Sequence, residues 1–151
     1  LALAEDLEYW AYTGEGLFKR GSWMEEGQMG RYSWLKIGFR MRDQEQAKRI
    51  RRRLSAWDRI EVTSSLPLQL EVNAKGVNKA NGVREACGLL GIDMSEVVAI
   101  GDGENDISMI MEAGLGVAMG NATDEVKRCA DLVTATNEQG GVAQVIQHYI
   151  L

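Results

Sequence analysis

The chain has 151 residues, of which 45% are hydrophobic and 26% are charged, and these proportions are typical of a globular protein and unlike those of a disordered one. The formal net charge of −5 argues against nucleic acid as a partner, and no apolar run approaches the roughly 20 residues of a membrane-spanning helix. We therefore expect no nucleic acid and no membrane among the partners. Cys87 and Cys129 lie in helix-like segments among apolar neighbours, so we expect buried free thiols and a cytoplasmic location.

The first half of the chain is patterned as strands and one helix. Residues 9–12 and 17–20 flank a glycine-containing stretch and predict a β-hairpin. Apolar and polar residues alternate over residues 35–41 and 68–72, which predicts two further half-buried strands. The apolar rows of these strands are Leu35, Ile37, Phe39 and Met41, and then Leu68, Leu70 and Val72.

Asp43 is a suitable cap for a helix that follows the first of these two strands, with Ala47, Ile50 and Leu54 on its inner face. The basic run at residues 48–53 is interrupted by Ile50, so it is interpreted as a solvated helix face and not as a nucleic-acid contact. These elements together indicate a small α+β lobe with an open antiparallel sheet over residues 1–73.

The second half, residues 74–151, alternates helices with short apolar strands. Asn78 can cap a helix over residues 79–90 that Gly91 ends, and Thr123 can cap another that ends near Ala130. Further helices are expected over residues 106–113 and 142–149, and strands over residues 97–100, 115–119 and 132–133. This order is typical of a Rossmann-like parallel α/β sheet.

The residues with clear chemical potential follow the strand at residues 97–100, in the stretch Gly101-Asp102-Gly103-Glu104-Asn105-Asp106. Ligands of open α/β sheets bind at the carboxyl ends of the strands, and the start of the next helix suits phosphate. The carboxylates of Asp102 and Asp106 suit a hard divalent cation, and Lys79, at a helix start, suits phosphate charge. An EF-hand loop starting at Asp102 is excluded because Ile107 and Ala113 stand where a glycine and a glutamate are required.

The order of these motifs resembles the haloacid dehalogenase-like superfamily, especially its capped small-molecule phosphatases of the sugar-phosphatase and phosphoglycolate-phosphatase type. The resemblance covers nearly all of residues 70–150. It rests on the following stretches: residues 76–79, 89–92, 98–109, 113–114, 117–122 and 140–143.

The resemblance implies a role for four residues. Lys79 matches the lysine that contacts the phosphoryl group and the nucleophile, and Asn105 matches a position that binds phosphate. Asp102 matches the Mg²⁺ ligand, and Asp106 matches the second acidic residue, which supports the metal or orients the lysine. The implied reaction is Mg²⁺-dependent hydrolysis of a small phosphorylated metabolite through an aspartyl-phosphate. The first half, residues 1–73, then corresponds to the C-terminal portion of the cap, and residues 74–151 to the C-terminal portion of the core.

The chain departs from the family pattern at the nucleophile, which is the first aspartate of an Asp-x-Asp segment. No aspartate of this chain is followed by another two residues later, as the full set shows: Asp6, Asp43, Asp58, Asp93, Asp102, Asp106, Asp124 and Asp131. We therefore expect an inactive fragment whose sheet lacks its central strand and presents an apolar edge. The missing N-terminal part of the protein, or a dimer mate, is the expected cover of that edge.

Two alternatives to the phosphatase are the phosphorylation domain of a cation-pumping ATPase and a non-catalytic regulatory or binding module that kept the fold. The missing membrane span and the cap-like lobe disfavour the ATPase. The substrate is not defined by the sequence. Trp10, Trp23, Trp34 and Trp57 all lie in the first half, where packing is expected for most of them and stacking on a sugar ring is the alternative. His148 is expected to be structural or exposed.

Overall fold

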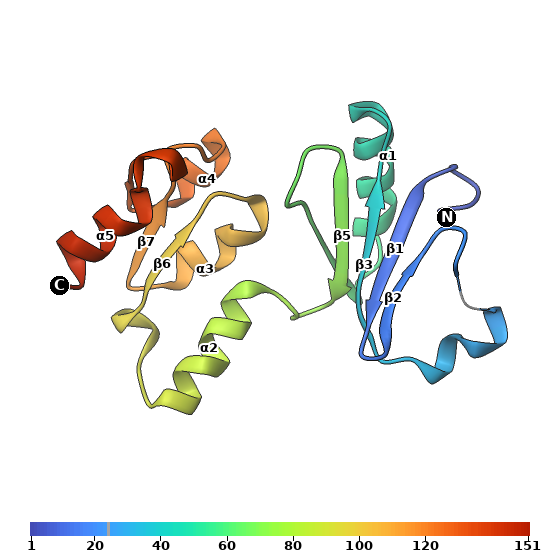
Figure 1. The fold of residues 1–151 in the computed structure, drawn as a ribbon, viewed down its shortest axis with the longest axis horizontal. Coiled ribbons are helices and arrows are strands. Elements are labelled where there is room, and N and C mark those ends of the chain that lie inside the picture. The colour runs from blue at the N-terminus through green and yellow to red at the C-terminus, as the bar shows by residue number, and fades with distance from the viewer. Residues whose placement is uncertain (24) are drawn as a thin grey trace. The chain divides into compact units, whose positions relative to one another are not determined.

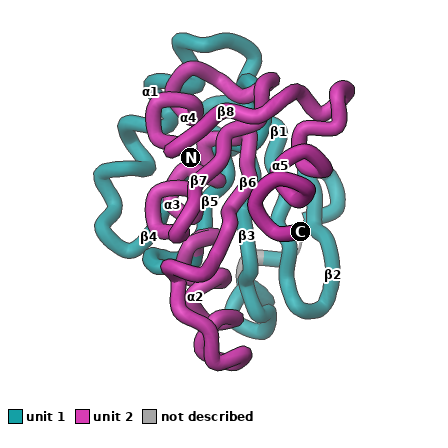
Figure 2. The backbone as a smooth tube through the Cα atoms, turned by 90° about the vertical axis from the view of Figure 1, so that its left-hand side faces the viewer, with its two compact units in different colours: residues 1–77 teal, residues 78–151 magenta. Residues whose placement is uncertain are grey.

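The protein is described by a computed structural model that covers residues 1–23 and 25–151, with the side chain of Glu26 also left undescribed. The chain folds into two compact units, residues 1–77 and residues 78–151 (Figure 2). The division falls between Val77 and Asn78, a few residues after the boundary expected from the sequence.

Unit 1 is a five-stranded antiparallel sheet of order β2-β1-β3-β5-β4, with one α-helix (Figure 1). The expected hairpin, the strand pair and the capped helix are all present. Their bounds are β1 Glu8–Thr13, β2 Gly16–Lys19, the 3-10 helix η1 Glu26–Arg31, β3 Trp34–Arg40, α1 Gln44–Ser55, β4 Ile60–Thr63 and β5 Gln69–Ala74. Asp43 caps α1, its side chain accepting a hydrogen bond from the Gln46 amide at 2.7 Å.

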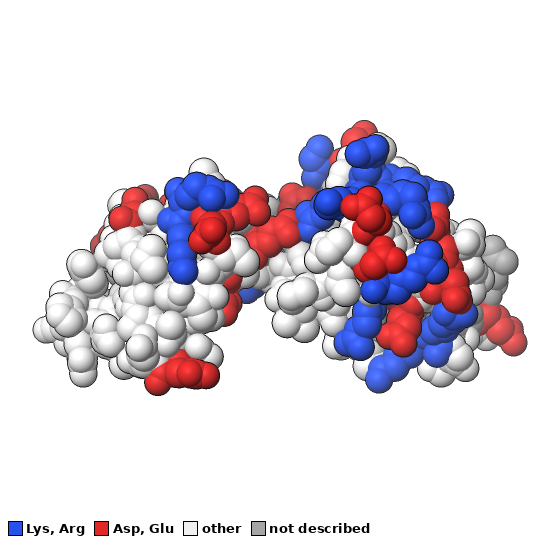
Figure 3. All heavy atoms as spheres, turned by 90° about the horizontal axis from the view of Figure 1, so that it is seen from above, with Lys and Arg blue, Asp and Glu red and all other residues white. Residues whose placement is uncertain are grey.

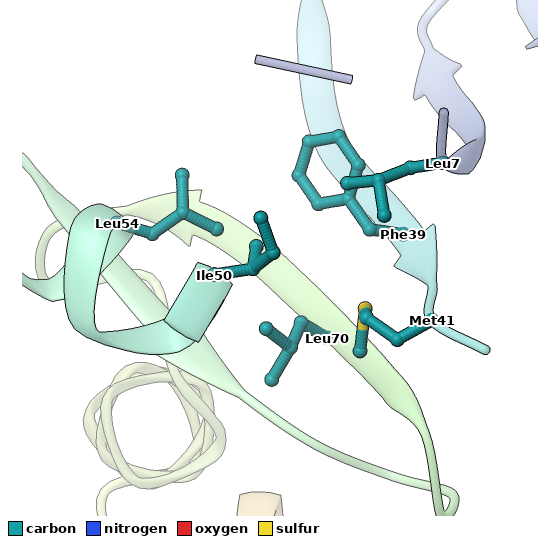
Figure 4. Close-up of a cluster of buried hydrophobic side chains, with 6 residues drawn as sticks. All are labelled: Leu7, Phe39, Met41, Ile50, Leu54 and Leu70. Carbon is teal, nitrogen blue, oxygen red and sulfur yellow. The ribbon is translucent and has the colours of Figure 1, made fainter. Parts of the chain in front are cut away.

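The core of unit 1 lies between α1 and one face of the sheet. Figure 4 shows the buried side chains of this cluster, which are Leu7, Phe39, Met41, Ile50, Leu54 and Leu70. Gln46 is also buried, because its side-chain amide donates to the Glu5 carbonyl at 3.0 Å and its oxygen accepts from the Arg42 amide at 3.0 Å. The expected inner face of α1 is therefore partly polar, with Ala47 only half-buried.

Lys48, Arg49 and Arg53 of α1 pair with acids, as expected for a solvated face. Arg49 and Arg53 both contact the Glu5 carboxylate, at 2.6 and 2.7 Å. Figure 3 shows Lys and Arg side chains intermingled with Asp and Glu on the visible face of unit 1. The pairing ties the N-terminal segment to α1 and leaves no uniformly basic surface there.

Two residues of the expected apolar rows lie outside the core cluster of unit 1. Leu35 is 58% exposed, because the register of β1 against β3 shifts between Tyr12 and Thr13 and breaks the alternation near the start of β3. Leu68 lies before β5 and has a left-handed backbone with φ of 60°. The prediction of one unbroken alternation over each strand was wrong at these ends.

Unit 2 is a three-stranded parallel sheet of order β6-β7-β8 with helices between the strands (Figure 1). Its elements are α2 Lys79–Leu90, η2 Met94–Glu96, β6 Val98–Gly101, η3 Glu104–Asp106, α3 Ile107–Glu112, β7 Leu115–Ala118, α4 Asp124–Cys129, β8 Leu132–Val133, η4 Asn137–Gln139 and α5 Gly141–Tyr149. The expected α/β fold with a parallel sheet and an antiparallel sheet is thus confirmed. Within the described residues β6 is an edge strand that pairs only with β7.

The ends of α2 follow the sequence signals closely. The Asn78 side chain accepts from the Asn81 amide at 2.9 Å, and Gly91 closes the helix in the left-handed conformation with φ of 70°. Thr123 precedes α4 with extended backbone, but its side chain makes no capping hydrogen bond, so that part of the prediction was wrong. Cys87 is buried, whereas Cys129 is only half-buried because it ends α4 one turn beyond the buried Val126.

Among the residues that the structure describes, no helix is long and apolar enough to cross a membrane.

Candidate functional site

The loop after β6 is closed by the side chain of Asp106. Its Oδ2 accepts hydrogen bonds from the backbone amides of Asp102 and Gly103, both at 3.0 Å, so the carboxylate folds back over the end of the strand. Gly101 makes room for this: a Cβ at position 101 would lie 2.4 Å from the Cβ of Asp106. The glycine is therefore needed for close packing, which lets the carboxylate reach the two amides.

Lys79, the first residue of α2, joins the same carboxylate. Its Nζ donates to Asp106 Oδ1 across 27 positions of sequence. The Lys79 side chain is 48% exposed and that of Asp106 only 6%. The buried Asp106 carboxylate therefore holds the Lys79 ammonium, whose remaining N–H groups can donate to a further anion.

The charge state of Asp106 follows from this environment. Burial by itself raises the pKa of the Asp106 carboxyl, but the hydrogen bonds from Lys79 and from the amides of Gly103 and Asp102, together with the lysine charge, outweigh it. The net pKa lies below the usual aspartate value, so Asp106 is ionised at neutral pH. An ionised Asp106 keeps Lys79 in place through a charge-assisted bond.

Asp102 has the opposite character, because its side chain is exposed and contacts a different part of the unit. Its Oδ2 accepts from Asn121 Nδ2 at 3.0 Å, and Asn121 Oδ1 accepts from the Asn137 amide at 3.0 Å. Asn121 follows β7 and Asn137 begins η4 after β8, so segments that follow all three strands are linked at one edge.

Asn121 was not singled out from the sequence as a site residue. It lies in a stretch that carries the family resemblance, but no role was assigned to it. The sequence signal that indicates Asp102 also applies to Asn121, because a polar side chain shortly after a buried parallel strand lies at the ligand-binding edge of the sheet.

Asn105 is the predicted site residue that the structure joins least to the others. It lies in η3, half-buried, with its Oδ1 close to Gly103. Within the described residues no hydrogen bond links its side chain to Lys79, Asp102 or Asp106. The structure therefore brings Lys79 and Asp106 together directly, and places Asp102 and Asn105 on the same loop.

The oxygen ligands at this site suit a Mg²⁺ ion better than a metal that needs three or more protein ligands. No group of three or more His, Cys, Asp or Glu side chains able to hold a metal occurs in the described part of the chain. Mg²⁺ typically takes one or two carboxylates and keeps several waters, or shares them with a phosphate. The exposed Asp102 carboxylate, oriented by Asn121, provides a ligand of this kind.

The remaining candidates of the sequence make no hydrogen bond or ion pair with Lys79, Asp102 or Asp106 within the described residues. His148 is exposed on α5, and its Nδ1 lies 2.9 Å from the Gln144 carbonyl, which is a local helix contact. Trp23 and Trp34 lie in an aromatic cluster of unit 1, with ring centroids 5.9 Å apart and ring planes tilted by 37°. Trp57 is 60% exposed, so packing does not account for it.

A parallel α/β unit carries a lysine at the start of its first helix and two aspartates after its first strand, and an α+β unit precedes it in the chain. A family model described as haloacid dehalogenase-like hydrolase matches residues 28–146. The chain belongs to this family, and the resemblance stated from its motifs is confirmed.

Two curated relatives are similar to this chain over much of its length. A 5-amino-6-(5-phospho-D-ribitylamino)uracil phosphatase of Bacillus subtilis, YcsE, is 43% identical over 143 residues, which make up 95% of this chain and 56% of that protein. A phosphoglycolate phosphatase of Methanopyrus kandleri is 42% identical over 103 residues, 68% of this chain and 44% of the relative. This chain therefore spans about half the length of these relatives.

A solved structure supports the same assignment. A haloacid dehalogenase superfamily phosphatase from Bacteroides thetaiotaomicron superimposes with a TM-score of 0.80 and 28% identity, over 97% of this chain and 60% of that one.

Proposed function

We propose that this chain supplies the metal- and phosphate-handling part of a Mg²⁺-dependent phosphatase that hydrolyses a small phosphorylated metabolite through an aspartyl-phosphate. The observation that carries the proposal is the Lys79–Asp106 pair beside the exposed Asp102 at the end of β6. The names of the relatives, phosphatases for phosphoglycolate and for a phosphorylated ribitylaminouracil, support a small phosphate ester as the substrate class.

Each side chain has a separate task in this proposal. Lys79 neutralises phosphoryl oxygens with the N–H groups that Asp106 does not take, and Asn105 donates to a further oxygen. Asp106 acts as a positioning residue, because its two oxygens are already engaged by Lys79 and by two backbone amides. We assign the metal contact chiefly to Asp102. Asp106 supports the ion indirectly, by holding the loop that carries Asp102 or through a bridging water molecule.

A Mg²⁺ ion at Asp102 would supply a Lewis acid that offsets the charge of the transferring phosphoryl group. Asn121 fixes the direction of the Asp102 carboxylate, and the Asn137 amide fixes Asn121. This chain of contacts pre-organises the ligand, which lowers the cost of ordering it when substrate binds.

The attacking carboxylate has to come from outside residues 1–151, because the chain holds no Asp-x-Asp segment. We propose that unit 1 belongs to the cap and unit 2 to the core of the complete site. The chain by itself is then expected to bind phosphate with Mg²⁺ but not to turn over an ester.

The test measures binding and turnover on the same purified chain. Inorganic phosphate is titrated by calorimetry with and without Mg²⁺, and p-nitrophenyl phosphate is offered as substrate. Binding that needs Mg²⁺, and that weakens at least roughly tenfold in Asp102→Ala and in Lys79→Met, is the expected result. If both variants bind phosphate as the original chain does, the proposed site is wrong. If the chain hydrolyses the ester with Mg²⁺, and Asp102→Ala abolishes this turnover, the prediction that the chain is inactive is wrong.

A fusion separates the enzyme from a non-catalytic module that kept the fold. A family segment with an Asp-x-Asp strand is placed ahead of Leu1, and the same ester is offered. Turnover that disappears when the first aspartate of that segment is changed to asparagine supports the enzyme. A fusion that folds and binds phosphate but remains inactive supports the non-catalytic module.

A further inference from the structure

The chain contains two places where an aspartate or an asparagine directly precedes a glycine, Asn81-Gly82 and Asp102-Gly103. Such pairs are chemically weak points of a polypeptide, because a glycine has no side chain to keep its amide nitrogen away from the preceding side chain. Asn81-Gly82 lies within α2, where the Gly82 amide donates to the Asn78 carbonyl at 3.1 Å. Asp102-Gly103 lies in the loop between β6 and η3, so it lacks the protection of a regular helix or strand.

The reaction that such an Asp-Gly pair undergoes needs no reagent besides water. The Gly103 amide nitrogen bonds to Cγ of Asp102, and one carboxyl oxygen leaves as water with the amide and the carboxyl hydrogens, which closes a succinimide ring. Water then adds to one of the two ring carbonyls. Addition at Cγ restores aspartate, whereas addition at the main-chain carbonyl gives isoaspartate, in which the backbone runs through Cβ and Cγ. The product therefore has the same atoms as the original chain.

Hydrogen bonds of the folded unit occupy both of the groups that would react. The Gly103 amide donates to Asp106 Oδ2 at 3.0 Å, and the Asp106 side chain is only 6% exposed. Asp102 Oδ2 accepts from Asn121 Nδ2 at 3.0 Å, which directs the carboxylate toward the segment after β7. Ring closure therefore requires that the amide leaves Asp106 and that the carboxyl group leaves Asn121.

The contact with Asp106 is the stronger of these two. The same Oδ2 also accepts from the Asp102 amide at 3.0 Å, so one carboxylate holds the peptide groups on both sides of Asp102. Hydrogen bonds to a buried, charged acceptor cost more to break than bonds at an exposed surface. Because Asp102 is exposed, water already reaches it, and the opening of the loop sets the rate of the reaction.

We propose that Asp102-Gly103 is a site of spontaneous isoaspartate formation, which the hydrogen bonds of Gly103 to Asp106 and of Asn121 to Asp102 suppress. Isomerisation lengthens the backbone by one carbon and leaves a carboxylate attached directly to Cα, so the carboxylate moves from the place that Asn121 fixes. The modification is independent of the proposed function, and only the loss of the Mg²⁺ ligand that it causes rests on that proposal.

The test follows isoaspartate in the purified chain during incubation at physiological temperature and constant pH. Methyl transfer from S-adenosylmethionine by an isoaspartate methyltransferase counts the product, and electron-transfer fragmentation of the tryptic peptide 85–127 places it at residue 102. The original chain in urea gives the rate of the unprotected pair. We expect slow formation in the folded chain and roughly tenfold or more faster formation in Asp106→Ala, because that variant lacks the acceptor of the Gly103 amide.

Two controls separate the role of Asp106 from a general loosening of unit 2. Gly116→Ala disturbs packing, since its Cβ would lie 2.1 Å from the Ile110 carbonyl oxygen, but it leaves both backbone hydrogen bonds to Asp106 untouched. Deamidation at Asn81-Gly82, measured in the same samples, reports the opening of α2. The ratio of isomerisation to this deamidation should rise in Asp106→Ala and stay near the original value in Gly116→Ala.

Three outcomes would overturn the inference: no isoaspartate at residue 102, equal rates in the original chain and Asp106→Ala, or equal acceleration in Asp106→Ala and Gly116→Ala. If Asp106→Ala does not fold, Asn121→Ala decides, because it frees the Asp102 carboxylate and leaves the amides bound. About a three- to fivefold acceleration is then expected, and an unchanged rate would overturn the inference.

The consequence for the site is measured separately. The chain, incubated until part of it is isomerised, is titrated with inorganic phosphate and Mg²⁺, and the fraction that binds should fall by the fraction isomerised. Full binding in the presence of isoaspartate at residue 102 refutes the metal contact assigned to Asp102 and leaves the isomerisation site standing. Phosphate binding that depends on Asp102, without any isoaspartate, refutes only the isomerisation site.

Discussion

Replacing Asp106 by alanine tests the central contact of the site. The change removes the acceptor of two backbone amides and the partner of Lys79, in a place where the Asp106 side chain is 6% exposed. Breaking a buried pair from one side costs about 3–5 kcal/mol. Because the Lys79 side chain is 48% exposed and regains water, we expect the lower end, about 3 kcal/mol.

Variants of Lys79 and Asp106 separate the contributions to this loss of unfolding free energy. Lys79→Met leaves the carboxylate with both amides, so we expect a loss of about 1 kcal/mol. Asp106→Asn keeps an acceptor for the amides but faces the ammonium with an N–H₂ group, so about 2 kcal/mol is expected. In the double variant Lys79→Met with Asp106→Asn, the cost should be smaller than the sum of the two, because the opposed donors are gone.

The tryptophans allow the unfolding of the two units to be followed separately. All four lie in unit 1, so fluorescence in a urea titration follows unit 1, while far-ultraviolet circular dichroism also follows the helices of unit 2. The Asp106→Ala variant should shift the dichroism transition and leave the fluorescence transition in place. A loss below about 1 kcal/mol, or a shift seen only in fluorescence, would refute the role assigned to Asp106.

Three further outcomes are expected. Since the folded-state pKa of Asp106 is lowered, its ionisation stabilises the protein above the unfolded pKa of about 3.9 and this contribution is lost as pH falls through the folded value; the stability advantage of the original chain over Asp106→Asn should shrink in urea titrations between about pH 5 and pH 2, and a constant difference would contradict the ionised carboxylate. Gly116→Ala should lower the unfolding free energy by about 3 kcal/mol, because its Cβ would lie 2.1 Å from the Ile110 carbonyl oxygen, whereas Gly88→Ala, in open space on α2, should raise it by about 0.5–1 kcal/mol; equal effects in urea melts would argue against this packing. Asn121→Ala should weaken Mg²⁺-dependent phosphate binding about three- to tenfold in calorimetry while changing the unfolding free energy by less than about 1 kcal/mol, and unchanged binding would remove Asn121 from the site.

Local signals in the sequence account for most of the fold. Caps such as Asp43 and Asn78, and the left-handed Gly91, act within a few residues, so the helices that they bound can be predicted from one sequence. Alternation also predicted β3 and β5, and short apolar runs predicted the three strands of unit 2. What failed was the register: the shift between β1 and β3 depends on a partner strand more than 20 positions away and exposes Leu35.

The site divides in the same way. Its residues were found because they follow a buried strand and match a family motif, but the contacts among them needed three-dimensional placement. The contact of Lys79 with Asp106, and that of Asn121 with Asp102, join residues 27 and 19 positions apart with no periodic pattern. Trp10 and Gly38 likewise come together only through the pairing of β1 with β3, where a Cβ on Gly38 would lie 2.1 Å from Cε2 of the indole.

The contact that steadies Asn121 comes from the backbone of residue 137, not from its side chain. Position 137 can therefore change to almost any amino acid without loosening the Asp102 carboxylate, and only proline, which has no amide hydrogen, breaks the link. Position 121 has no such freedom, because its side chain both accepts from that amide and donates to the carboxylate. In a library that varies both positions under selection for phosphate binding, residue 121 should stay asparagine while residue 137 drifts.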